Sequence, residues 1–389
     1  MDQLFSKGIL NTPSSFIREI LKVTESDDII SFAGGLPNPI SFPTQELNES
    51  TNRVIHTFQS KVFQYSTTEG YIPLREYIAN QYKEKYNLEY NKDDILITTG
   101  SQQALDLLGK VLINEGDALA IEKPGYLGAI QSFSLYQPSF KGIDLLDDGL
   151  DTDMLEDTLR SNKVKLLYTV PNFQNPTGLT YSKEKRDKIF EIMSKYNTVL
   201  VEDDPYGDLR FDGENLPYIG ANKLPNSVLL GSISKIITPG FRLGWICTKN
   251  KELMHHLVVA KQASDLHSNI FSQYVINDYL AHNDLQTHIL KIKQLYKEQS
   301  TAMIHAMEQY FPKDVKYTKP QGGMFMWVTL PNGQSAVDLF ERASKKNVAF
   351  VPGDPFYTDM TNVPTLRLNY TNSDSDTIYE GIKRIASVM

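Results

Sequence analysis

The sequence predicts an α/β protein, with a large domain built on a mostly parallel sheet flanked by helices and a smaller α+β domain after it. In the middle of the chain, short and nearly continuous apolar runs alternate with amphipathic stretches, which is typical of parallel strands buried on both faces. After about residue 282 this alternation gives way to one long helical stretch and then to mixed strands and helices. The length of 389 residues also exceeds what one compact core usually spans, so two domains are expected.

The strands of the large domain are assigned from apolar and β-branched runs, and its helices from amphipathic stretches between them. We predict strands at residues 95–99, 118–122, 140–145, 165–170, 198–202, 228–232 and 243–248. We predict helices at residues 102–114, 127–135, 153–161, 183–196 and 251–263. The last two strands are joined too tightly for a crossover helix, so they either pair antiparallel or lie apart with an irregular loop between them.

The C-terminal third begins with a helical stretch rich in Lys, Gln, Glu and Ala at residues 285–310, which we interpret as the connector into the small domain. The elements expected after it are strands at 324–329, 348–351 and 365–369 and helices at 336–345 and 376–387. We therefore divide the chain into residues 1–45 (an N-terminal arm and part of the small domain), 46–282 (the large domain) and 283–389 (the small domain). The arm contains the turn-forming string Gly-Gly-Leu-Pro-Asn-Pro at 34–39, and we expect it to be ordered by packing on something else, such as a second subunit.

Composition excludes several classes of function. Apolar residues make up 41% and charged residues 22% of the chain, as in an ordinary folded protein. The net charge is 39 − 47 = −8 and no long basic run is present, so nucleic acid is not an expected partner. No apolar stretch reaches the roughly 18 residues of a membrane span, and the N-terminus lacks an apolar signal core, so we expect a cytoplasmic protein. Cys247 is the only cysteine, and the seven histidines show no metal-ligand spacing.

One lysine stands out because of its neighbours. The string Ser232-Ile233-Ser234-Lys235 directly follows the predicted buried strand 228–232, and Arg242 comes seven residues later. Most lysines are solvated surface charges. Partial desolvation and nearby positive charge lower the pKa of an amine, which favours its neutral and nucleophilic form.

Other polar residues also follow predicted strands. Asn175 begins an Asn-Pro-Thr-Gly turn, and Asp203 and Asp204 follow strand 198–202. Because ligands of parallel α/β sheets bind at the carboxyl ends of the strands, these side chains are candidates for one site. Either aspartate could serve on physical grounds, and a helix N-cap or structural ion pair is the alternative. Ser101 begins a predicted helix, where it could cap the helix or bind phosphate with the backbone N–H groups.

Arg367 lies in the middle of the predicted strand 365–369. A charge inside an apolar strand is costly unless it is paired. Arg367 therefore either forms an internal salt bridge or binds an anionic ligand, and the guanidinium fork suits a carboxylate.

The order of these residues resembles that of the fold-type-I aminotransferases of class I and II, which depend on pyridoxal 5′-phosphate. Asn175 and Asp203 are 28 residues apart and Asp203 and Lys235 are 32 apart, and both intervals are of the size that the family uses. Three further strings look most like the branch of 2-aminoadipate aminotransferases and kynurenine aminotransferase II, at residues 64–70 (Gln-Tyr-Ser-Thr-Thr-Glu-Gly), 99–104 (Thr-Gly-Ser-Gln-Gln-Ala) and 322–327 (Gly-Gly-Met-Phe-Met-Trp). The resemblance runs from about residue 14 to residue 367.

The resemblance implies a role for each central residue. Lys235 would form the covalent link to pyridoxal 5′-phosphate and then move a proton of the substrate. The Asp-x-x-Tyr spacing selects Asp203 over Asp204 as the partner of the pyridinium nitrogen. Asn175 and Tyr206 would donate hydrogen bonds to the phenolate oxygen of the cofactor, and Asn175 would also take part in substrate binding.

The resemblance also implies the surroundings. Tyr126 would stack on the cofactor ring, and Tyr65 would reach the phosphate in the neighbouring subunit. Arg367 would bind the substrate α-carboxylate, for which Gly35 leaves room. Arg18 matches a position that can contact an acidic substrate side chain, although a solvated helix face is equally open. The residues implied at the phosphate of their own subunit are Ser101, Gln102, Ser232, Ser234 and Arg242.

We therefore expect the fold-type-I architecture, with seven strands in the large sheet and 243–248 as its one antiparallel strand. The expected function is transfer of an amino group from an L-amino acid to a 2-oxo acid such as 2-oxoglutarate, by a homodimer with shared active sites. The donor stays open among 2-aminoadipate, glutamate, kynurenine, aromatic and branched-chain amino acids. Two alternatives are a lyase or decarboxylase on the same fold and a regulatory domain of MocR type without its DNA-binding module. The start of the chain directly at the arm makes the regulator the weaker alternative.

Overall fold

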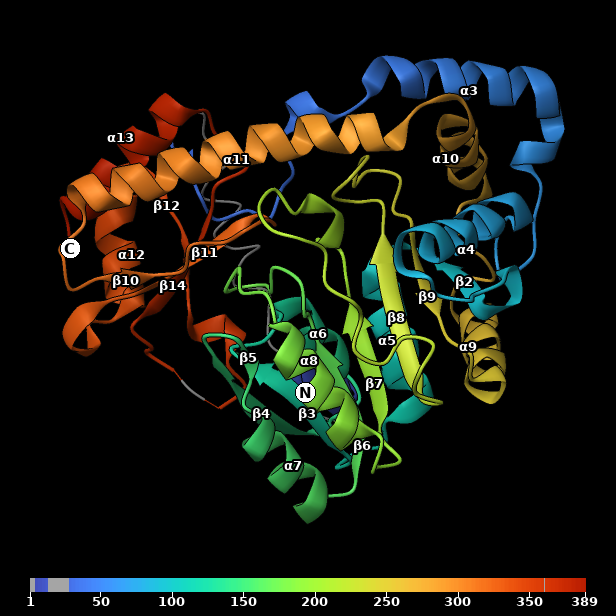
Figure 1. Ribbon diagram of the computed structural model, residues 1–389, viewed down its shortest axis with the longest axis horizontal. Helices are drawn as coiled ribbons and strands as arrows, with labels where there is room; N and C mark the ends of the chain where they lie inside the picture. Colours follow the sequence, from blue (N-terminus) through green and yellow to red (C-terminus); the bar gives the residue numbers. More distant parts are fainter. Residues whose placement is uncertain (1–3, 13–27, 360) are drawn as a thin grey trace.

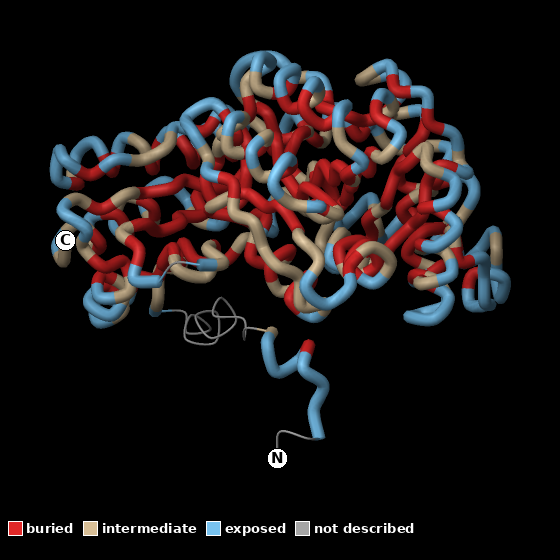
Figure 2. Tube along the Cα trace, turned by 90° about the horizontal axis from the view of Figure 1, so that it is seen from below, coloured by how far each residue is buried: buried red, intermediate tan, exposed pale blue. Residues whose placement is uncertain are grey.

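A computed structural model describes residues 4–12, 28–359 and 361–389. Two sheets organise these residues (Figure 1): an eight-stranded sheet in the middle of the molecule and a four-stranded sheet at one end. Helix α11 (Leu285–Tyr310) runs along one side from the small sheet towards α10 (Ile270–His282). Buried residues lie in the interior of the trace (Figure 2), and most strands of both sheets, β4 and β10 excepted, consist mainly of such residues.

The large sheet has the strand order β2-β9-β8-β7-β6-β3-β4-β5. Neighbours among β4, β3, β6, β7 and β8 pair in parallel, whereas β9 is antiparallel to both β2 and β8. The bounds are β2 (Ile95–Thr98), β3 (Ala118–Lys123), β4 (Ser139–Leu146), β5 (Gly149–Leu150), β6 (Val164–Thr169), β7 (Val199–Asp203), β8 (Ser227–Ser232) and β9 (Gly244–Cys247). These pairings confirm the predicted mostly parallel sheet, and segment 243–248 takes the antiparallel alternative.

Both faces of the sheet are covered, which explains the continuous apolar strands. Within β6, Leu167 belongs to the core beneath α7 and α8, while Leu166 and Tyr168 on the other face belong to the core that includes α5. Successive side chains of a strand point to opposite faces, so a strand covered twice must be apolar throughout. The helices are α5 (Gly100–Leu112), α6 (Leu127–Ser134), α7 (Thr152–Ser161), α8 (Lys183–Met193) and α9 (Lys251–Ser264).

The prediction of seven strands was wrong by one. Strand β5 forms a tight antiparallel hairpin with β4, and Gly149 has a φ of 136°, which glycine tolerates and other residues rarely adopt. Two residues are too few to show any periodicity in the sequence. Four of the described helices were also not assigned: α1 (Lys7–Asn11), α3 (Thr44–Phe58), α4 (Ile72–Tyr86) and α10, whose buried residues surround most of its circumference and leave no one-sided apolar stripe.

The small sheet has the order β10-β11-β14-β13 and is antiparallel throughout. Its strands are β10 (Lys316–Tyr317), β11 (Phe325–Thr329), β13 (Val351–Pro352) and β14 (Thr365–Asn369), and α12 (Ala336–Ser344) and α13 (Ser375–Ala386) lie beside it. Separately, β1 (Ile30–Ser31) pairs in parallel with β12 (Val348–Ala349). The single strand predicted at 348–351 was therefore wrong: Phe350 separates two short strands that belong to different sheets.

The N-terminal helix α1 (Lys7–Asn11) is mostly exposed (Figure 2). Its end contacts the large domain, because Asn11 Nδ2 donates a hydrogen bond of 3.4 Å to Gln137 Oε1. Among the helices that the structure describes, none combines the length and the apolar character that crossing a membrane requires.

Candidate active site

The candidate site is a cavity of about 270 Å³ at the carboxyl ends of the parallel strands of the large sheet. Strands β7 and β8 end in its wall, α5 begins there, and β14 of the small sheet adds Arg367. All the predicted site residues except Tyr65 and Arg18 line it, namely Gly35, Ser101, Gln102, Tyr126, Asn175, Asp203, Tyr206, Ser232, Ser234, Lys235, Arg242 and Arg367. The structure thus brings together residues that span more than 300 positions of the chain.

Asp203 is the last residue of β7 and is almost completely buried. Its Oδ2 accepts a hydrogen bond of 2.7 Å from the hydroxyl of Tyr168, whereas Oδ1 has no partner among the described residues. Burial raises the pKa of Asp203 to about 7, against the opposing effect of the Tyr168 hydrogen bond. The carboxyl is therefore not a helix cap or one half of an ion pair; it presents a free oxygen to the cavity.

Lys235 lies just beyond β8, and its Nζ donates a hydrogen bond of 2.7 Å to the carbonyl of Gly35. Burial, together with the smaller effects of the positive charges of Arg367 and Arg242, lowers the pKa of Lys235 to about 8. An amine with this pKa is partly neutral near neutral pH, which a nucleophile or a general base requires.

Arg367 is 2% exposed and forms no ion pair with any described residue. Its Nη1 donates to Asn175 Oδ1 at 2.8 Å and its Nη2 donates to the carbonyl of Ala33 at 2.7 Å, while Nε has no partner. The guanidinium also lies over the rings of Phe325 and Phe356, at 4.3 and 5.1 Å. Burial lowers the pKa of Arg367 to about 10, so a cation is held there without a compensating charge. This excludes the internal salt bridge and favours an anionic ligand.

Asn175 and Tyr206 lie together in the wall. Asn175 Nδ2 is 3.4 Å from the Tyr206 hydroxyl, to which it donates. Because Asn175 Oδ1 accepts from Arg367, the orientation of the Asn175 amide is fixed from both sides. Tyr126, directly before α6, lines the same cavity, and burial raises its pKa to about 12, with Asp203 as the next contribution.

The start of α5 and the loop after β8 form one end of the cavity. Ser101 Oγ is buried and has no partner among the described residues. The Ser232 hydroxyl accepts from the backbone N–H of Ser234 at 3.1 Å and donates to the Ser234 hydroxyl at 2.9 Å. Arg242 approaches so closely that a Cβ at Gly100 would lie 2.7 Å from its Nη2. Hydroxyls, a guanidinium and a helix N-terminus together make an anion-binding cup.

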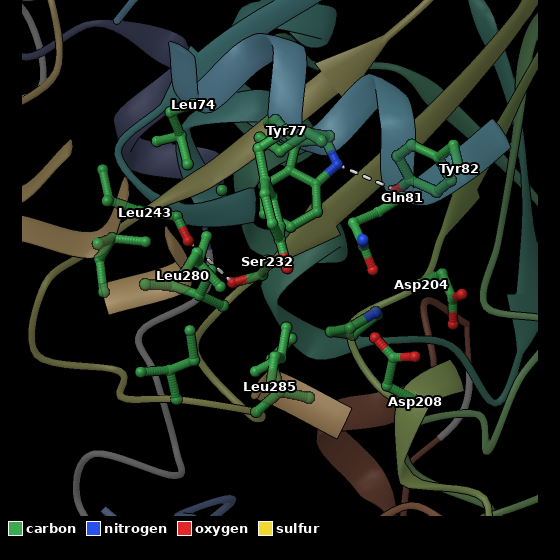
Figure 3. A pocket seen from close by; sticks show the side chains of 18 of the residues that line it. Leu74, Tyr77, Gln81, Tyr82, Asp204, Asp208, Ser232, Leu243, Leu280 and Leu285 are labelled. Atoms are coloured by element: carbon green, nitrogen blue, oxygen red, sulfur yellow. Dashed lines mark hydrogen bonds between the residues drawn. The ribbon is translucent and has the colours of Figure 1, made fainter. Parts of the chain in front are cut away.

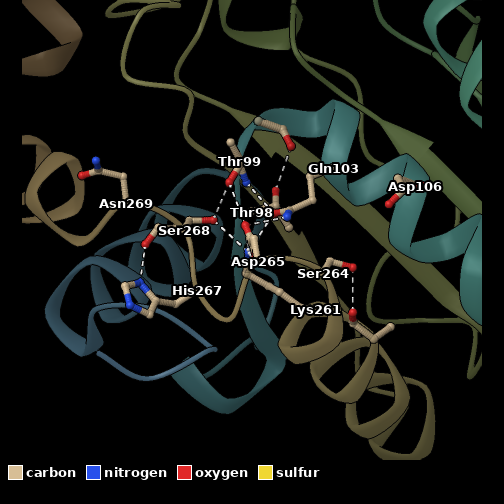
Figure 4. A network of polar contacts seen from close by, with 12 residues as sticks. Thr98, Thr99, Gln103, Asp106, Lys261, Ser264, Asp265, His267, Ser268 and Asn269 are labelled. Carbon is tan, nitrogen blue, oxygen red and sulfur yellow. Dashed lines mark hydrogen bonds and ion pairs between the residues drawn. The ribbon is translucent and has the colours of Figure 1, made fainter. Parts of the chain in front are cut away.

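A network of polar side chains holds the start of α5 (Figure 4). The completely buried Lys261 donates to Gln103 Oε1 at 2.7 Å, to the Asp265 carboxylate at 2.9 Å and to the Ser268 hydroxyl at 3.0 Å. Gln103 Oε1 also accepts from the backbone N–H of Thr99, directly before α5. Ser101 is therefore not the N-cap, which is Thr99.

Two predicted residues lie elsewhere. Tyr65 is 79% exposed and packs edge-on against His267, with the ring centroids 5.9 Å apart, outside the cavity of its own chain. Arg18 falls outside the residues that the structure describes.

A second cavity, of about 80 Å³, shares Pro205 and Ser232 with the first. Figure 3 shows side chains that line this second cavity. Trp245 Nε1 donates to the Tyr82 hydroxyl at 3.0 Å in its wall. Ser232 is its only predicted site residue. The other walls are mainly apolar and include Leu74, Ile78, Leu243, Leu280 and Leu285.

Comparison with known proteins gives the family. The family model described as "Aminotransferase class I and II" matches residues 37–385. The chain belongs to the class I and II aminotransferases. The aromatic-amino-acid aminotransferase 1 of Thermococcus litoralis is 43% identical over 394 residues, covering 100% of this chain and 94% of the relative.

Solved structures agree with this assignment. The kynurenine aminotransferase of Pyrococcus horikoshii, in complex with PMP, superposes with a TM-score of 0.94 at 43% identity, covering 100% of this aminotransferase and 97% of that chain. The alpha-aminoadipate aminotransferase of Thermus thermophilus, complexed with N-(5′-phosphopyridoxyl)-L-leucine, gives 0.92 at 39% identity with the same coverage. The fold is therefore that of the fold-type-I aminotransferases, and the cofactor of this aminotransferase is pyridoxal 5′-phosphate.

The cavity fits this cofactor. Three buried polar atoms on its wall have no partner among the described residues: the Asp203 Oδ1 acceptor, the Ser101 hydroxyl and the Arg367 Nε donor. Together they offer what a protonated ring nitrogen, a phosphate and a carboxylate require, and buried polar groups are rarely left unpaired without such a reason.

Three aromatic residues that contact Asp203 or Arg367 were not predicted from the sequence. Tyr168 holds Asp203, and Phe325 and Phe356 lie under Arg367. Strand alternation could have found Tyr168, because it shares a face with Val170, which also lines the cavity. Nothing in the sequence places Phe356 near Arg367, since the contact depends on how the 354–356 turn folds back onto β14.

Proposed function

We propose that this aminotransferase takes its amino group from L-amino acids with an aromatic or acidic side chain and passes it to a 2-oxo acid, with 2-oxoglutarate as the natural acceptor. The observation that carries the proposal is Arg367, a buried guanidinium without an acidic partner on the wall that also holds Lys235. Every amino acid and 2-oxo acid has the carboxylate that such a group binds. The range of donors is supported by relatives named for aromatic amino acids, kynurenine and alpha-aminoadipate.

Two residues carry the proton chemistry in this proposal. When bound, pyridoxal 5′-phosphate supplies an electron-withdrawing ring that stabilises negative charge at the substrate Cα. Asp203 Oδ1 holds the proton on the ring nitrogen, which keeps that capacity high. Lys235 would hold the cofactor covalently through Nζ, and the same Nζ, when free, would be the base that takes the proton from the substrate Cα and moves it to the cofactor carbon two bonds away.

The remaining cavity residues bind and orient. Asn175 and Tyr206 donate hydrogen bonds to the phenolate oxygen, and Tyr126 covers one face of the ring. Arg367 binds the substrate carboxylate next to Asn175 and Gly35, and Arg18 is proposed to contact acidic side chains. The phosphate is held by Ser101, Gln102, Ser232, Ser234 and Arg242.

We also propose a homodimer with shared sites, a cytoplasmic location and the domain division at residues 45 and 282. The dimer is supported by Tyr65, which is exposed and has no role in its own cavity. The domain division is supported by the two sheets, which lie in residues 95–247 and 316–369. Cell fractionation and limited proteolysis test the location and the division.

One experiment tests the function directly. The cofactor-loaded protein is mixed with single L-amino acids, and the absorbance of the bound cofactor is followed as the amino group is retained on it. Aromatic amino acids, kynurenine, glutamate and 2-aminoadipate should react fastest, and added 2-oxoglutarate should restore the starting spectrum. Release of ammonia or carbon dioxide without amino-group transfer would instead identify a lyase or decarboxylase.

A further inference from the structure

Glu122 is a completely buried acid that the proposed chemistry does not use. It lies near the end of β3 and forms no ion pair with any described residue. Its Oε1 accepts from the backbone N–H of Val170 at 2.7 Å and from the Tyr181 hydroxyl at 2.6 Å, and the Thr169 hydroxyl is 2.8 Å away. Burial raises the pKa of Glu122, and these hydrogen bonds oppose that effect. Only the other oxygen, Oε2, is left to act on something else.

Glu122 Oε2 accepts a hydrogen bond of 2.8 Å from Gln174 Nε2. Gln174 is also completely buried, and the same Nε2 donates to the carbonyl of Pro124 at 2.9 Å. Its Oε1 accepts from both the backbone N–H and the hydroxyl of Thr177, at 2.9 and 2.7 Å. Two acceptors face the nitrogen and two donors face the oxygen, so the amide has one satisfied orientation.

Gln174 also fixes the turn that carries Asn175. Its backbone N–H donates to the carbonyl of Leu179 at 2.8 Å, and its own carbonyl accepts from Gly178. Asn175 lies inside this closed turn, with its side chain against Arg367 and Tyr206. The Pro124 carbonyl that Gln174 binds is two residues before Tyr126. The Glu122–Gln174 pair therefore connects the ends of β3 and β6 with the turns that hold two cavity residues.

We propose that Glu122 and Gln174 are positioning residues, which set Asn175 at the distance where its amide bridges Arg367 to the phenolate oxygen of the cofactor. This inference rests on the proposed function of Asn175. The carboxylate suits the position because it is an acceptor at both oxygens, so the side-chain amide of Gln174 has no freedom to flip. A flipped Gln174 amide would put its carbonyl oxygen against Glu122 Oε2 and its NH₂ against the Thr177 N–H.

Exchanging the acid of Glu122 and the amide of Gln174 gives the sharpest test. Glu122→Gln puts an NH₂ group against the NH₂ of Gln174, and Gln174→Glu puts two carboxylates face to face. The double variant Glu122→Gln/Gln174→Glu restores one donor against one acceptor at this contact, although the Pro124 carbonyl loses its donor. Groups in one network couple, so each single variant should lose roughly tenfold or more in kcat/KM, and the double variant should regain most of that loss.

A second readout does not depend on turnover. The absorbance of the bound cofactor is titrated against pH. A hydrogen bond donated to a charged oxygen favours its deprotonated form, so displacing Asn175 should move the titration midpoint upward. The single variants should show this shift and the double variant should return towards the wild-type midpoint. The titration needs no amino-acid substrate, so it still tests the positioning role if the proposed transfer reaction fails.

Asp94→Asn is the matched control. Asp94 is also a completely buried acid, paired with Lys249 at 2.9 Å and Lys251 at 2.6 Å, but it precedes β2 at the end opposite to the cavity. It should lower the melting temperature without moving the midpoint of the pH titration.

If the exchange variants do not fold, Thr177→Val removes one donor to Gln174 Oε1 and should give a smaller shift of the midpoint in the same direction. Three outcomes would each overturn the positioning role. The pH midpoint could be unchanged in the folded variants, or Asp94→Asn could show the same shift. The third outcome is a double variant whose loss in kcat/KM equals the product of the losses in the two single variants.

Discussion

At the residue scale, burial acts on Asp203 and Lys235 in opposite directions and brings their pKa values close together. It raises the pKa of Asp203 to about 7 and lowers that of Lys235 to about 8. Each group is therefore biased towards its neutral form in the cofactor-free protein. A protonated ring nitrogen beside Asp203 Oδ1 would reverse the bias on that carboxyl, so cofactor binding and the charge on Asp203 are linked.

Lys235→Ala should still bind the cofactor but lose amino-group transfer, because no other amine lines the cavity in the described chain. Proton transfer by a positioned side chain typically raises a reaction rate about 10²–10⁴-fold. The rate of the first half-reaction, in which the amino acid gives its amino group to the cofactor, should therefore fall by at least that much. Borohydride reduction of the wild type followed by peptide mapping should find the pyridoxyl group on Lys235. A label on another lysine contradicts the assignment.

Asp203→Asn and Asp204→Asn should separate the two adjacent acids. Asp203 presents a free oxygen to the cavity, whereas Asp204 is occupied by Asn172 at 3.0 Å and Tyr218 at 2.6 Å. Asp203→Asn should weaken cofactor binding and slow Cα deprotonation, and Asp204→Asn should mainly lower the melting temperature. Equilibrium dialysis, stopped-flow absorbance and thermal unfolding distinguish them. An inactive but stable Asp204→Asn beside an active Asp203→Asn reverses the choice.

The raised pKa of Asp203 also predicts how the cofactor-free protein responds to pH. Between about pH 4 and pH 7 the folded state keeps a proton on Asp203 that the unfolded state has released, so this group makes stability fall as pH rises. Asp203→Asn removes that dependence. Its melting temperature relative to wild type should therefore increase from pH 5 to pH 8 without cofactor, and a constant difference across this range contradicts the prediction.

At the element scale, the site depends on close approach between the start of α5 and the loop after β8. Gly100 has a φ of +72° and lies against Arg242. These two requirements, backbone conformation and space, can be separated because Gly116 has a similar φ of +86° with nothing within 4 Å of a Cβ. The geometry of this helix start therefore sets how closely the Arg242 guanidinium can approach α5.

Gly100→Ala should raise the dissociation constant of the cofactor by about tenfold or more, since a charged hydrogen bond is worth roughly 1.5–3 kcal/mol. Gly116→Ala is the control for backbone strain and should cost only about 1 kcal/mol of stability. Cofactor titration followed by fluorescence, together with thermal unfolding, measures both effects. Equal dissociation constants in the two variants would show that Arg242 tolerates the methyl group.

Much of the arrangement of strands, helices and site residues could be predicted from the sequence. Parallel strands that end in polar residues place those residues at one edge of the sheet. The positions of Asn175, Asp203 and Lys235 follow from that rule. The division of segment 348–351 between two sheets does not, because a four-residue apolar run looks the same in either pairing. Tyr168 was missed because a buried tyrosine in an apolar strand is ordinarily core.

At the scale of the whole molecule, the site is assembled from distant parts of the chain. Arg367 comes from the small sheet, Asp203 ends a strand of the large sheet, Lys235 lies in the loop after another of its strands, and Gly35 comes from near the N-terminus. Tyr65 is exposed at another surface. No sequence periodicity describes such an arrangement, so only the resemblance to a family could predict which of these residues meet.

The proposed dimer predicts complementation between two defective chains. Tyr65→Ala and Lys235→Ala should each be nearly inactive alone. In the mixed dimer, the site with an intact Lys235 also receives an intact Tyr65 from its partner, so co-refolding should restore part of the activity. Activity assays of the mixture, with sedimentation as the control for assembly, test this. A fully active monomer contradicts the shared site.

With Arg367 as the proposed binding partner of the substrate carboxylate, its burial also predicts which compounds the enzyme ignores. An amine without a carboxylate could reach Lys235, but it would leave the Nε donor of a fully buried guanidinium unsatisfied. Sites built around such a group reject analogues that lack its partner by up to about 10⁴–10⁵-fold, far beyond what a tighter apolar pocket achieves. Polyamines and decarboxylated amino acids should therefore leave the bound cofactor untouched even where they far outnumber the true donors. In this proposal, selection for a carboxylate depends on one unpaired nitrogen, Arg367 Nε.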